Sequence, residues 1–233
     1  MVVPSLRGYG ESDKPARAGN YEVGTLAADV LAIADELGHE TFRLVGHDWG
    51  GVVAWETAIR VPGRVQRLVI LDAPHPDAWA RVALRHPIQL LRSSYVAFFQ
   101  LPWLPEAVIR ARGFALARRM LTRTSTPGTF ADDDLDRYVM AWRRPEALTS
   151  MLNYYRALRR KPRRPPARIS PKTLVIWGGK DAFLSRQVFE ASLATCDDGE
   201  GIWIEEATHW VHLEQPGRVA DEILRCFRGT DAT

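Results

Sequence analysis

The chain has 233 residues, of which 46% are hydrophobic, and a formal net charge of +3. These values are ordinary for one large globular domain, or for a core with an inserted lid, and they give no reason to expect a nucleic-acid partner. No stretch approaches the roughly eighteen uninterrupted apolar residues of a membrane span, and no targeting signal opens the chain, so we expect a cytoplasmic protein with no membrane partner.

The first third of the chain predicts a helix, a strand and a second helix. Apolar residues recur at intervals of three and four over residues 21–37, which predicts an amphipathic helix, and Gly38 follows as a stop signal. An apolar strand is expected at 42–46. The helix-like stretch after it ends near Pro62.

Further strands and helices alternate later in the chain. Strands are expected at 67–71, 173–177 and 202–204, with helices near 185–195 and from about residue 218 to 227. Such alternation predicts an α/β fold with a mostly parallel sheet covered by helices on both faces.

The middle of the chain shows no β pattern. Residues 78–165 are rich in Leu, Ala, Arg and aromatic residues, which predicts a helical lid inserted between two parts of an α/β core, 1–77 and 166–233. The lid is expected over the carboxyl ends of the strands, where α/β sheets place their ligands.

Positive charge gathers in one proline-rich stretch. Its basic residues are Arg156, Arg159, Arg160, Lys161, Arg163, Arg164 and Arg168. We interpret this stretch as a solvated, semi-rigid connector rather than a site for an anionic partner. The two cysteines, Cys196 and Cys226, have no metal or redox spacing and are expected to be reduced and structural.

One carboxylate lies at a predicted strand-to-helix turn. Asp48 has Gly46 and Gly50 two positions to either side, so the chain can reverse sharply and project the Asp48 side chain into a cleft. A serine attacking a saturated carbon would form a stable ether, whereas an aspartate forms an ester that water can cleave. The turn therefore predicts displacement at an sp³ carbon followed by hydrolysis.

Seven short motifs follow one another along nearly the whole chain. They are RGYGESDKP (7–15), GHDWGG (46–51), APHP (73–76), SYVAFFQLP (94–102), NYYR (153–156), WGGKD (177–181) and HW (209–210). In this order and spacing the chain resembles the α/β-hydrolase superfamily, and within it the soluble epoxide hydrolases. The resemblance implies an α/β-hydrolase fold and an enzyme that uses no cofactor and no metal.

By this resemblance, Asp181 and His209 complete a catalytic triad with Asp48 in the order nucleophile, acid, histidine. His209 would take a proton from the attacking water, and Asp181 would orient the imidazole and stabilise its charged form. Asp72, at the end of the 67–71 strand, is the alternative acid. His212 is the alternative histidine, expected to be exposed or at the cleft rim.

The resemblance also implies that two phenols of the lid, Tyr95 and Tyr155, stabilise the alkoxide that forms as an epoxide ring opens. Tyr154 competes with Tyr155, because adjacent helical residues point about 100° apart and only one can face the cleft. Trp49 would supply an oxyanion-hole N–H, and its indole could instead bind a halide. His47 is expected to be a buried, hydrogen-bonded support.

We therefore expect an epoxide hydrolase acting on a small apolar epoxide, and a homo-oligomer is possible. The alternatives are a haloalkane or haloacid dehalogenase acting on a halide, and a non-catalytic binding protein of the same fold. Members of the family normally begin with further strands and a loop that supplies the second oxyanion-hole donor. Because this chain opens after that loop, we expect weak activity from the chain alone.

Overall fold

The computed structural model describes residues 1–159 and 167–229. It divides into two compact units, each built from two segments of the chain. The sheet unit comprises Val30–Ser93 with Arg164–Thr233, and the helical unit comprises Met1–Asp29 with Ser94–Arg163. Helix α1 (Val23–Glu36) begins in the helical unit and ends in the sheet unit.

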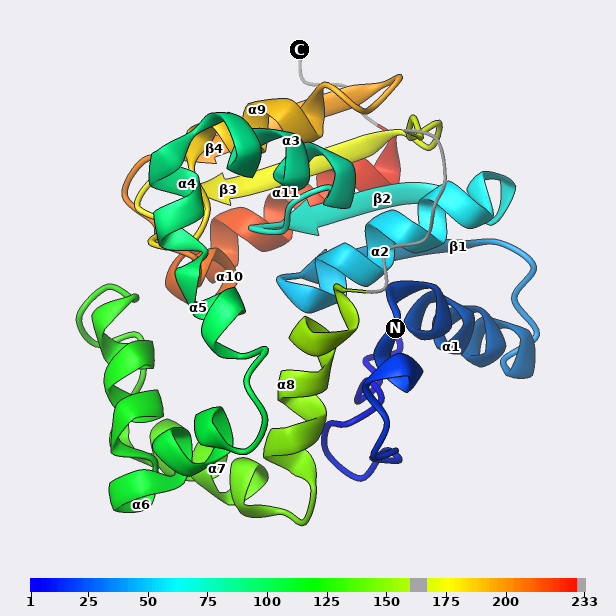
Figure 1. Ribbon diagram of the computed structural model, residues 1–233. Coiled ribbons are helices and arrows are strands. Elements are labelled where there is room, and N and C mark those ends of the chain that lie inside the picture. Colours follow the sequence, from blue (N-terminus) through cyan, green and yellow to red (C-terminus); the bar gives the residue numbers. More distant parts are fainter. Residues whose placement is uncertain (160–166, 230–233) are drawn as a thin grey trace. The chain divides into compact units, whose positions relative to one another are not determined.

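The described residues of the sheet unit form four parallel strands, which lie in the order in which they occur along the chain (Figure 1). They are β1 (Phe42–His47), β2 (Val65–Leu71), β3 (Thr173–Gly178) and β4 (Gly199–Ile204). Leu71 of β2 pairs with His47 of β1 on one side and with Ile176 of β3 on the other. All four carboxyl ends consequently meet at one edge of the sheet, as the alternating pattern predicts.

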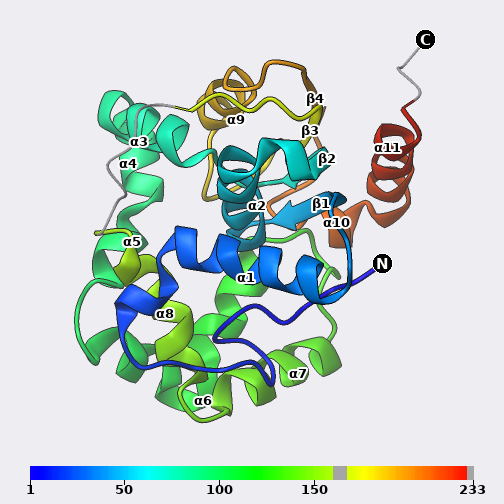
Figure 2. The same cartoon turned by 90° about the vertical axis from the view of Figure 1, so that its right-hand side faces the viewer.

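Helices cover both faces of this sheet (Figure 2). One face packs on α2 (Trp49–Arg60), α3 (Pro76–Arg85) and α9 (Arg186–Leu193), and the other on α10 (Val211–Glu214) and α11 (Pro216–Arg228). Leu68 and Ile70 of β2 enter the first core, whereas Val69 and Leu71 enter the second. This division of alternate residues between two cores explains why β2 is a continuous apolar run.

Shorter elements complete the sheet unit. The 3₁₀ turn η2 (Pro62–Arg64) ends the α2 segment, and α4 (Pro87–Arg92) follows α3. Cys196 and Cys226 are free and buried, one in each core, in agreement with the prediction.

The helical unit has its own small core. Its helices are η1 (Ala18–Tyr21), α5 (Ser94–Phe98), α6 (Leu104–Arg123), α7 (Asp132–Arg143) and α8 (Ala147–Ala157). Phe114, Val139 and Leu152 pack together from α6, α7 and α8. The N-terminal segment is tied to α8 because the Tyr21 hydroxyl donates to Ser150 Oγ at 2.8 Å and the Tyr154 hydroxyl to the Arg7 carbonyl at 2.6 Å.

The predicted α/β fold is confirmed, with differences at the ends of elements. The last strand begins at Gly199 rather than at residue 202, and the closing helix extends to Arg228. The predicted boundaries of the lid stay predictions: the compact units divide the chain at Ser94 instead of residue 78, and residue 165 lies outside the described residues. No helix in the described parts of the chain is long and apolar enough to span a membrane.

The basic stretch lies partly outside the described residues, at 160–166. On either side of that gap, Arg156 and Arg168 have structural partners. Arg156 pairs with Glu106 at 2.7 Å and Arg168 pairs with Asp197.

Candidate active site

Four polar side chains follow the carboxyl ends of the four strands. Asp48 comes directly after β1, Asp72 directly after β2, Asp181 three residues after β3, and His209 five residues after β4. Because parallel strands end at the same edge, all four residues gather there.

The turn at Asp48 depends on close approach of its glycines. Asp48 has φ 48° and ψ −122°, a backbone conformation that costs a non-glycine residue about 1–3 kcal/mol. A Cβ atom on Gly46 would lie 2.3 Å from the Gly50 carbonyl oxygen, and one on Gly51 would lie 2.2 Å from Cβ of Ala73. The sharp reversal that the sequence predicts is therefore present. Gly46 and Gly51 are required for steric reasons, whereas a Cβ on Gly50 would meet nothing within 4 Å.

His209 lies between the two carboxylates of the predicted triad. Its Nδ1 is 2.9 Å from Oδ2 of Asp181, and its Nε2 is 3.8 Å from Oδ1 of Asp48. Asp181 is fixed in turn, because its Oδ1 accepts the N–H groups of Phe183 at 2.6 Å and Leu184 at 2.9 Å. The structure thus brings Asp48, His209 and Asp181 together in the predicted order.

The charges around His209 favour its protonated form. Burial opposes protonation, but the adjacent Asp181 carboxylate, helped by Asp48 and Asp72, raises the pKa of His209 to about 9. His209 consequently carries a positive charge at neutral pH while Asp48 is ionised.

Asp48 is both accessible and partly desolvated. About half of its side-chain surface, 48%, is exposed. Surrounding atoms still exclude enough water to raise its pKa, although the positive charge of His209 and the backbone N–H of Trp49 act in the opposite direction. The Trp49 N–H therefore faces the Asp48 carboxyl group, where an oxyanion donor would be needed.

Asp72 holds a different position. It is fully buried, and its Oδ1 accepts the Gly178 N–H at 2.8 Å, which links the ends of β2 and β3. Its Oδ2 has no hydrogen-bond partner among the described residues. Burial and the charge of Asp181 raise the pKa of Asp72 well above its ordinary value. The ring of His209 bonds to Asp181, so the geometry favours Asp181 over Asp72 as the acid.

Asp72, Asp181 and His209 each place a potential metal-ligand atom within 4.8 Å of the others. The Nδ1 atom of His209 is already engaged by Asp181 at 2.9 Å. A metal bound by these three groups would have to replace that hydrogen bond, so the arrangement fits a triad better than a metal site.

Two further histidines surround His209. His47 Nε2 donates to the His209 carbonyl oxygen at 2.8 Å, as predicted, but the residue is half-buried rather than buried. The rings of His47 and His212 have centroids 4.3 Å apart, and burial together with the charge of His209 lowers the pKa of both. His212 is half-buried. Among the described contacts, it is His209 that bonds to Asp181.

The lid tyrosines are neighbours within the helical unit. The rings of Tyr95 and Tyr155 meet edge to face with centroids 5.7 Å apart, and both contact Phe99. Tyr154 is fully buried, and its hydroxyl donates a hydrogen bond to the Arg7 carbonyl. Burial raises the pKa of Tyr154. The structure therefore pairs Tyr95 with Tyr155. Their position relative to Asp48 stays a prediction.

Comparison with known proteins shows which family the chain resembles. A family model described as the alpha/beta hydrolase fold matches residues 1–216. The chain is 38% identical over 230 residues to the AB hydrolase superfamily protein YfhM of Bacillus subtilis, which covers 98% of this chain and 80% of that protein. It is 36% identical to human Epoxide hydrolase 4, of whose length it spans 64%.

Solved structures give the same picture. The structure of an epoxide hydrolase from Bacillus megaterium with an inhibitor matches with a TM-score of 0.85 at 26% identity, covering 96% of this chain and 82% of that one. A putative acyltransferase from Salmonella enterica matches with a TM-score of 0.86 at 25% identity, covering 97% of this chain and 78% of that one. Since the same fold carries differently named proteins, the chemistry has to be argued from the site.

Proposed function

The chain belongs to the α/β-hydrolase fold family, and from that premise we propose that it hydrolyses an epoxide to a vicinal diol through an ester formed on Asp48. One observation carries the proposal: an accessible aspartate occupies the strand-to-helix turn, with His209 3.8 Å behind it and Asp181 holding the other side of the imidazole. The epoxide hydrolases among its relatives support the choice of substrate class.

In the first step a carboxylate oxygen of Asp48 attacks a ring carbon of the epoxide. The bond between that carbon and the ring oxygen breaks, and the electron pair goes to the oxygen. Tyr95 or Tyr155 donates a phenolic proton to the resulting alkoxide. A halide leaves without a proton, so a paired set of phenols favours an epoxide over a haloalkane as the substrate.

In the second step water attacks the ester carbonyl carbon while His209 takes one of its protons. The oxyanion accepts a hydrogen bond from the Trp49 N–H. When the tetrahedral intermediate collapses, the diol oxygen leaves with the proton from His209. The proton that remains on the Asp48 carboxyl group passes to His209, which restores the charged pair of the free protein and completes the cycle.

The charge of Asp48 links the two steps. In the free protein the Asp48 carboxylate helps to hold His209 protonated, so the imidazole cannot act as a base. Ester formation removes that negative charge, so the pKa of His209 falls and the imidazolium gives its proton through solvent to the tyrosinate left by the first step. His209 therefore becomes a base at the step that needs one.

Single-turnover labelling tests the proposal. The protein, in excess over styrene oxide in ¹⁸O-labelled water, should acquire the label in the peptide that contains Asp48, and the first diol released should be unlabelled. His209→Gln should accumulate an adduct on that peptide, and Asp48→Asn should form none. Label that enters the diol directly, with no adduct in His209→Gln, would overturn the ester mechanism.

Parallel assays decide between the substrate classes. Turnover of 1-chlorohexane without turnover of styrene oxide would favour a dehalogenase, and neither reaction nor adduct would favour a binding protein. The weak activity expected of this chain alone stays a prediction that the steady-state kcat tests.

A further inference from the structure

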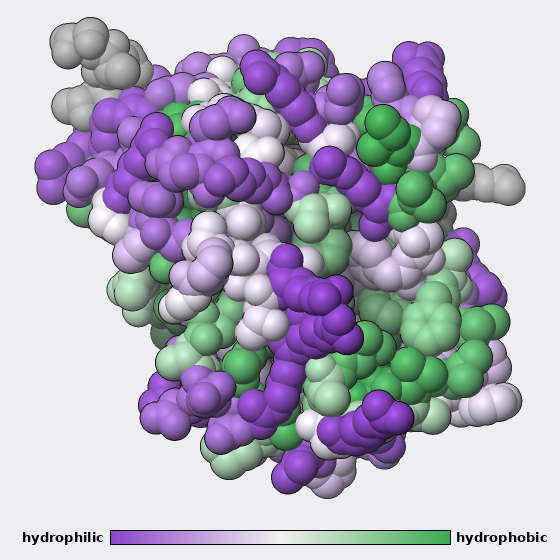
Figure 3. Space-filling model, turned by 90° about the vertical axis from the view of Figure 1, so that its left-hand side faces the viewer, coloured by the Kyte–Doolittle hydropathy of each residue, from purple (hydrophilic) through white to green (hydrophobic). Residues whose placement is uncertain are grey.

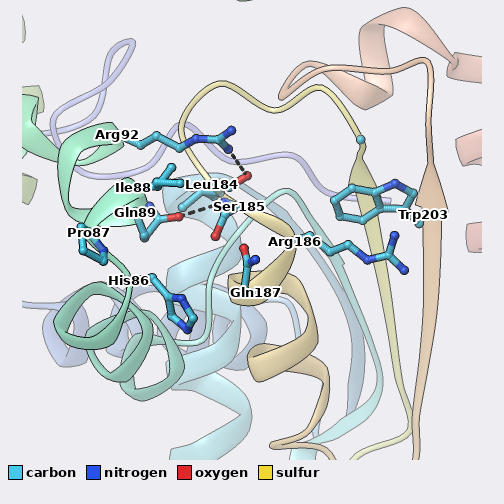
Figure 4. A pocket seen from close by; sticks show the side chains of 11 residues that line it. His86, Pro87, Ile88, Gln89, Arg92, Leu184, Ser185, Arg186, Gln187 and Trp203 are labelled. Carbon is cyan, nitrogen blue, oxygen red and sulfur yellow. Dashed lines mark hydrogen bonds between the residues drawn. The ribbon is translucent and has the colours of Figure 1, made fainter.

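A pocket of about 340 Å³ lies within the sheet unit, beside the loop that joins β3 to α9 (Figure 4). α4 and the residue before it contribute His86, Ile88, Gln89 and Arg92, and the start of α9 contributes Ser185, Arg186 and Gln187. Trp203 of β4 completes one wall. The pocket includes none of Asp48, Asp181 and His209.

Cationic groups dominate the charged lining of this pocket. Arg92 and Arg186 are both exposed, and the pocket-lining residues include no Asp or Glu. Arg186 pairs with Glu190 at 3.0 Å and lies over the ring of Trp203 at 5.2 Å. Arg92 donates to the backbone carbonyls of Asp181 and Leu184 at 3.1 and 3.4 Å, so its described partners are neutral groups.

The N-terminus of α9 adds polar donors. The N–H groups of Arg186 and Gln187 have no backbone acceptor among the described residues. Ser185 precedes them as the N-cap, yet its hydroxyl makes no capping bond. Its Oγ is buried and has no partner within the described chain, and the residue is only 8% exposed. A buried hydroxyl without a partner destabilises the fold, and a bound acceptor would remove that penalty.

The position of Ser185 is fixed by its neighbours. Its N–H donates to Oε1 of Gln89 at 2.9 Å (Figure 4). The amide group of Gln89 donates to the Phe183 carbonyl at 2.9 Å. In this view Ser185 lies between Gln89 and Gln187 with His86 below them. The Ser185 hydroxyl and the start of α9 are therefore fixed in the pocket lining, to which Arg92 and Arg186 contribute from separate sides (Figure 4).

We propose that this pocket binds a small organic anion, with its carboxylate or phosphate at the N-terminus of α9 and its apolar part against Ile88 and Trp203. Helix N-termini favour anions through their free N–H groups and the helix dipole. The volume is at the lower end for small-molecule sites and larger than a bare phosphate requires. Ile88 is 69% exposed. The face drawn in Figure 3 carries hydrophobic patches among hydrophilic ones.

NMR titration with phenyl phosphate tests the site in the whole protein at constant ionic strength. Backbone amides of Ser185, Arg186 and Gln187 and the indole N–H of Trp203 should shift together and saturate. Inorganic phosphate should shift the same backbone amides with lower affinity, and phenol should not shift them. Arg186→Gln and Ser185→Ala should each weaken phenyl phosphate binding by about tenfold, as expected for a lost charge-assisted hydrogen bond.

Arg137→Gln is the matched control, because Arg137 is an exposed arginine in a short-range ion pair with Asp134 of α7. It should bind phenyl phosphate as the unmodified protein does. Absence of saturable shifts at millimolar phenyl phosphate would overturn the proposal. Equal losses in Arg137→Gln and Arg186→Gln would also overturn it, since the effect would then be one of net charge. The readout is independent of the epoxide reaction.

Discussion

Nε2 of His209 lies 3.8 Å from Oδ1 of Asp48, which is beyond hydrogen-bond distance but close enough for strong interaction between their charges. The charge of Asp48 therefore affects the pKa of His209 although the two side chains are not hydrogen-bonded. A change in the charge of Asp48 should be visible in the protonation of His209.

Asp48→Asn imitates the uncharged ester while keeping the size of the side chain. We expect the pKa of His209 to fall from about 9 toward its ordinary value of 6.5, because one of the charges that raise it is removed. Titration of the imidazole resonances by NMR measures this change. An unaltered pKa in Asp48→Asn would contradict the link between ester formation and base activation.

The raised pKa of His209 also predicts how stability depends on pH. Between about pH 6.5 and 9 the folded state holds a proton on His209 that the unfolded state releases, so the free energy of unfolding should fall as the pH rises through this window. The contribution of His209 is at most about 3 kcal/mol. Urea unfolding at pH 6.5 and 9 measures it, and His209→Gln should lose most of the difference.

The two buried aspartates should respond differently to amide substitution. Asp181→Asn removes the acceptor that orients His209 and should lower kcat by about 10³-fold or more. Asp72→Asn keeps an oxygen for the Gly178 N–H and should retain most of the turnover.

Stability offers a second readout for Asp72. Its raised pKa means that the folded state loses stability as the pH rises above 3.8, where the unfolded carboxyl group ionises. Asp72→Asn should therefore be more stable than the unmodified protein at neutral pH. Greater loss of kcat in Asp72→Asn than in Asp181→Asn would reverse our assignment of the acid.

Substituting the adjacent residues Tyr154 and Tyr155 one at a time distinguishes a structural role from a catalytic one. Tyr154→Phe removes a buried hydrogen bond to Arg7 and should cost about 1–2 kcal/mol of stability with kcat preserved. Tyr155→Phe should lower kcat for an epoxide with little change in stability. Chemical denaturation and single-turnover kinetics on both variants provide the comparison, and the opposite pattern would assign the catalytic phenol to Tyr154.

Gly46→Ala tests the steric account of the turn. Its new Cβ would lie 2.3 Å from the Gly50 carbonyl, so the turn must distort, and we expect a loss of about 3 kcal/mol or more together with loss of turnover. Gly63→Ala is the control, since a Cβ there meets nothing within 4 Å. Similar melting temperatures for the two variants would refute this account.

Local patterns in the sequence predicted the four strands, several of the helices that flank them and the turn at Asp48, whereas the resemblance supplied Asp181 and His209. The glycines around Asp48 and the apolar run of β2 each identify a turn or a strand from a few neighbouring residues. The parallel order of the strands then brings Asp48, Asp181 and His209 to one edge of the sheet. The resemblance also supplied the tyrosine pair, and the structure shows that the hydroxyl of the competing Tyr154 donates to the Arg7 carbonyl.

Other features depend on contacts between distant parts of the chain. Residues 1–29 join the helical unit through hydrogen bonds such as that from Tyr21 to Ser150. A local sequence pattern cannot predict such a bond. The unsatisfied Ser185 hydroxyl and the bond from Arg92 to the Asp181 carbonyl also appear only after folding. The signal available in the sequence was the Ser185 N-cap position before an amphipathic helix.

The pairing of β2 with β3 joins residue 68 to residue 173 across the whole helical insertion. During synthesis on the ribosome, the nascent chain will expose the apolar β2 run for as long as it takes to translate roughly a hundred further codons, several seconds at ordinary elongation rates. Chaperone demand in the cell should therefore be set by this waiting time, and slowing translation within the insertion should increase aggregation of newly made protein.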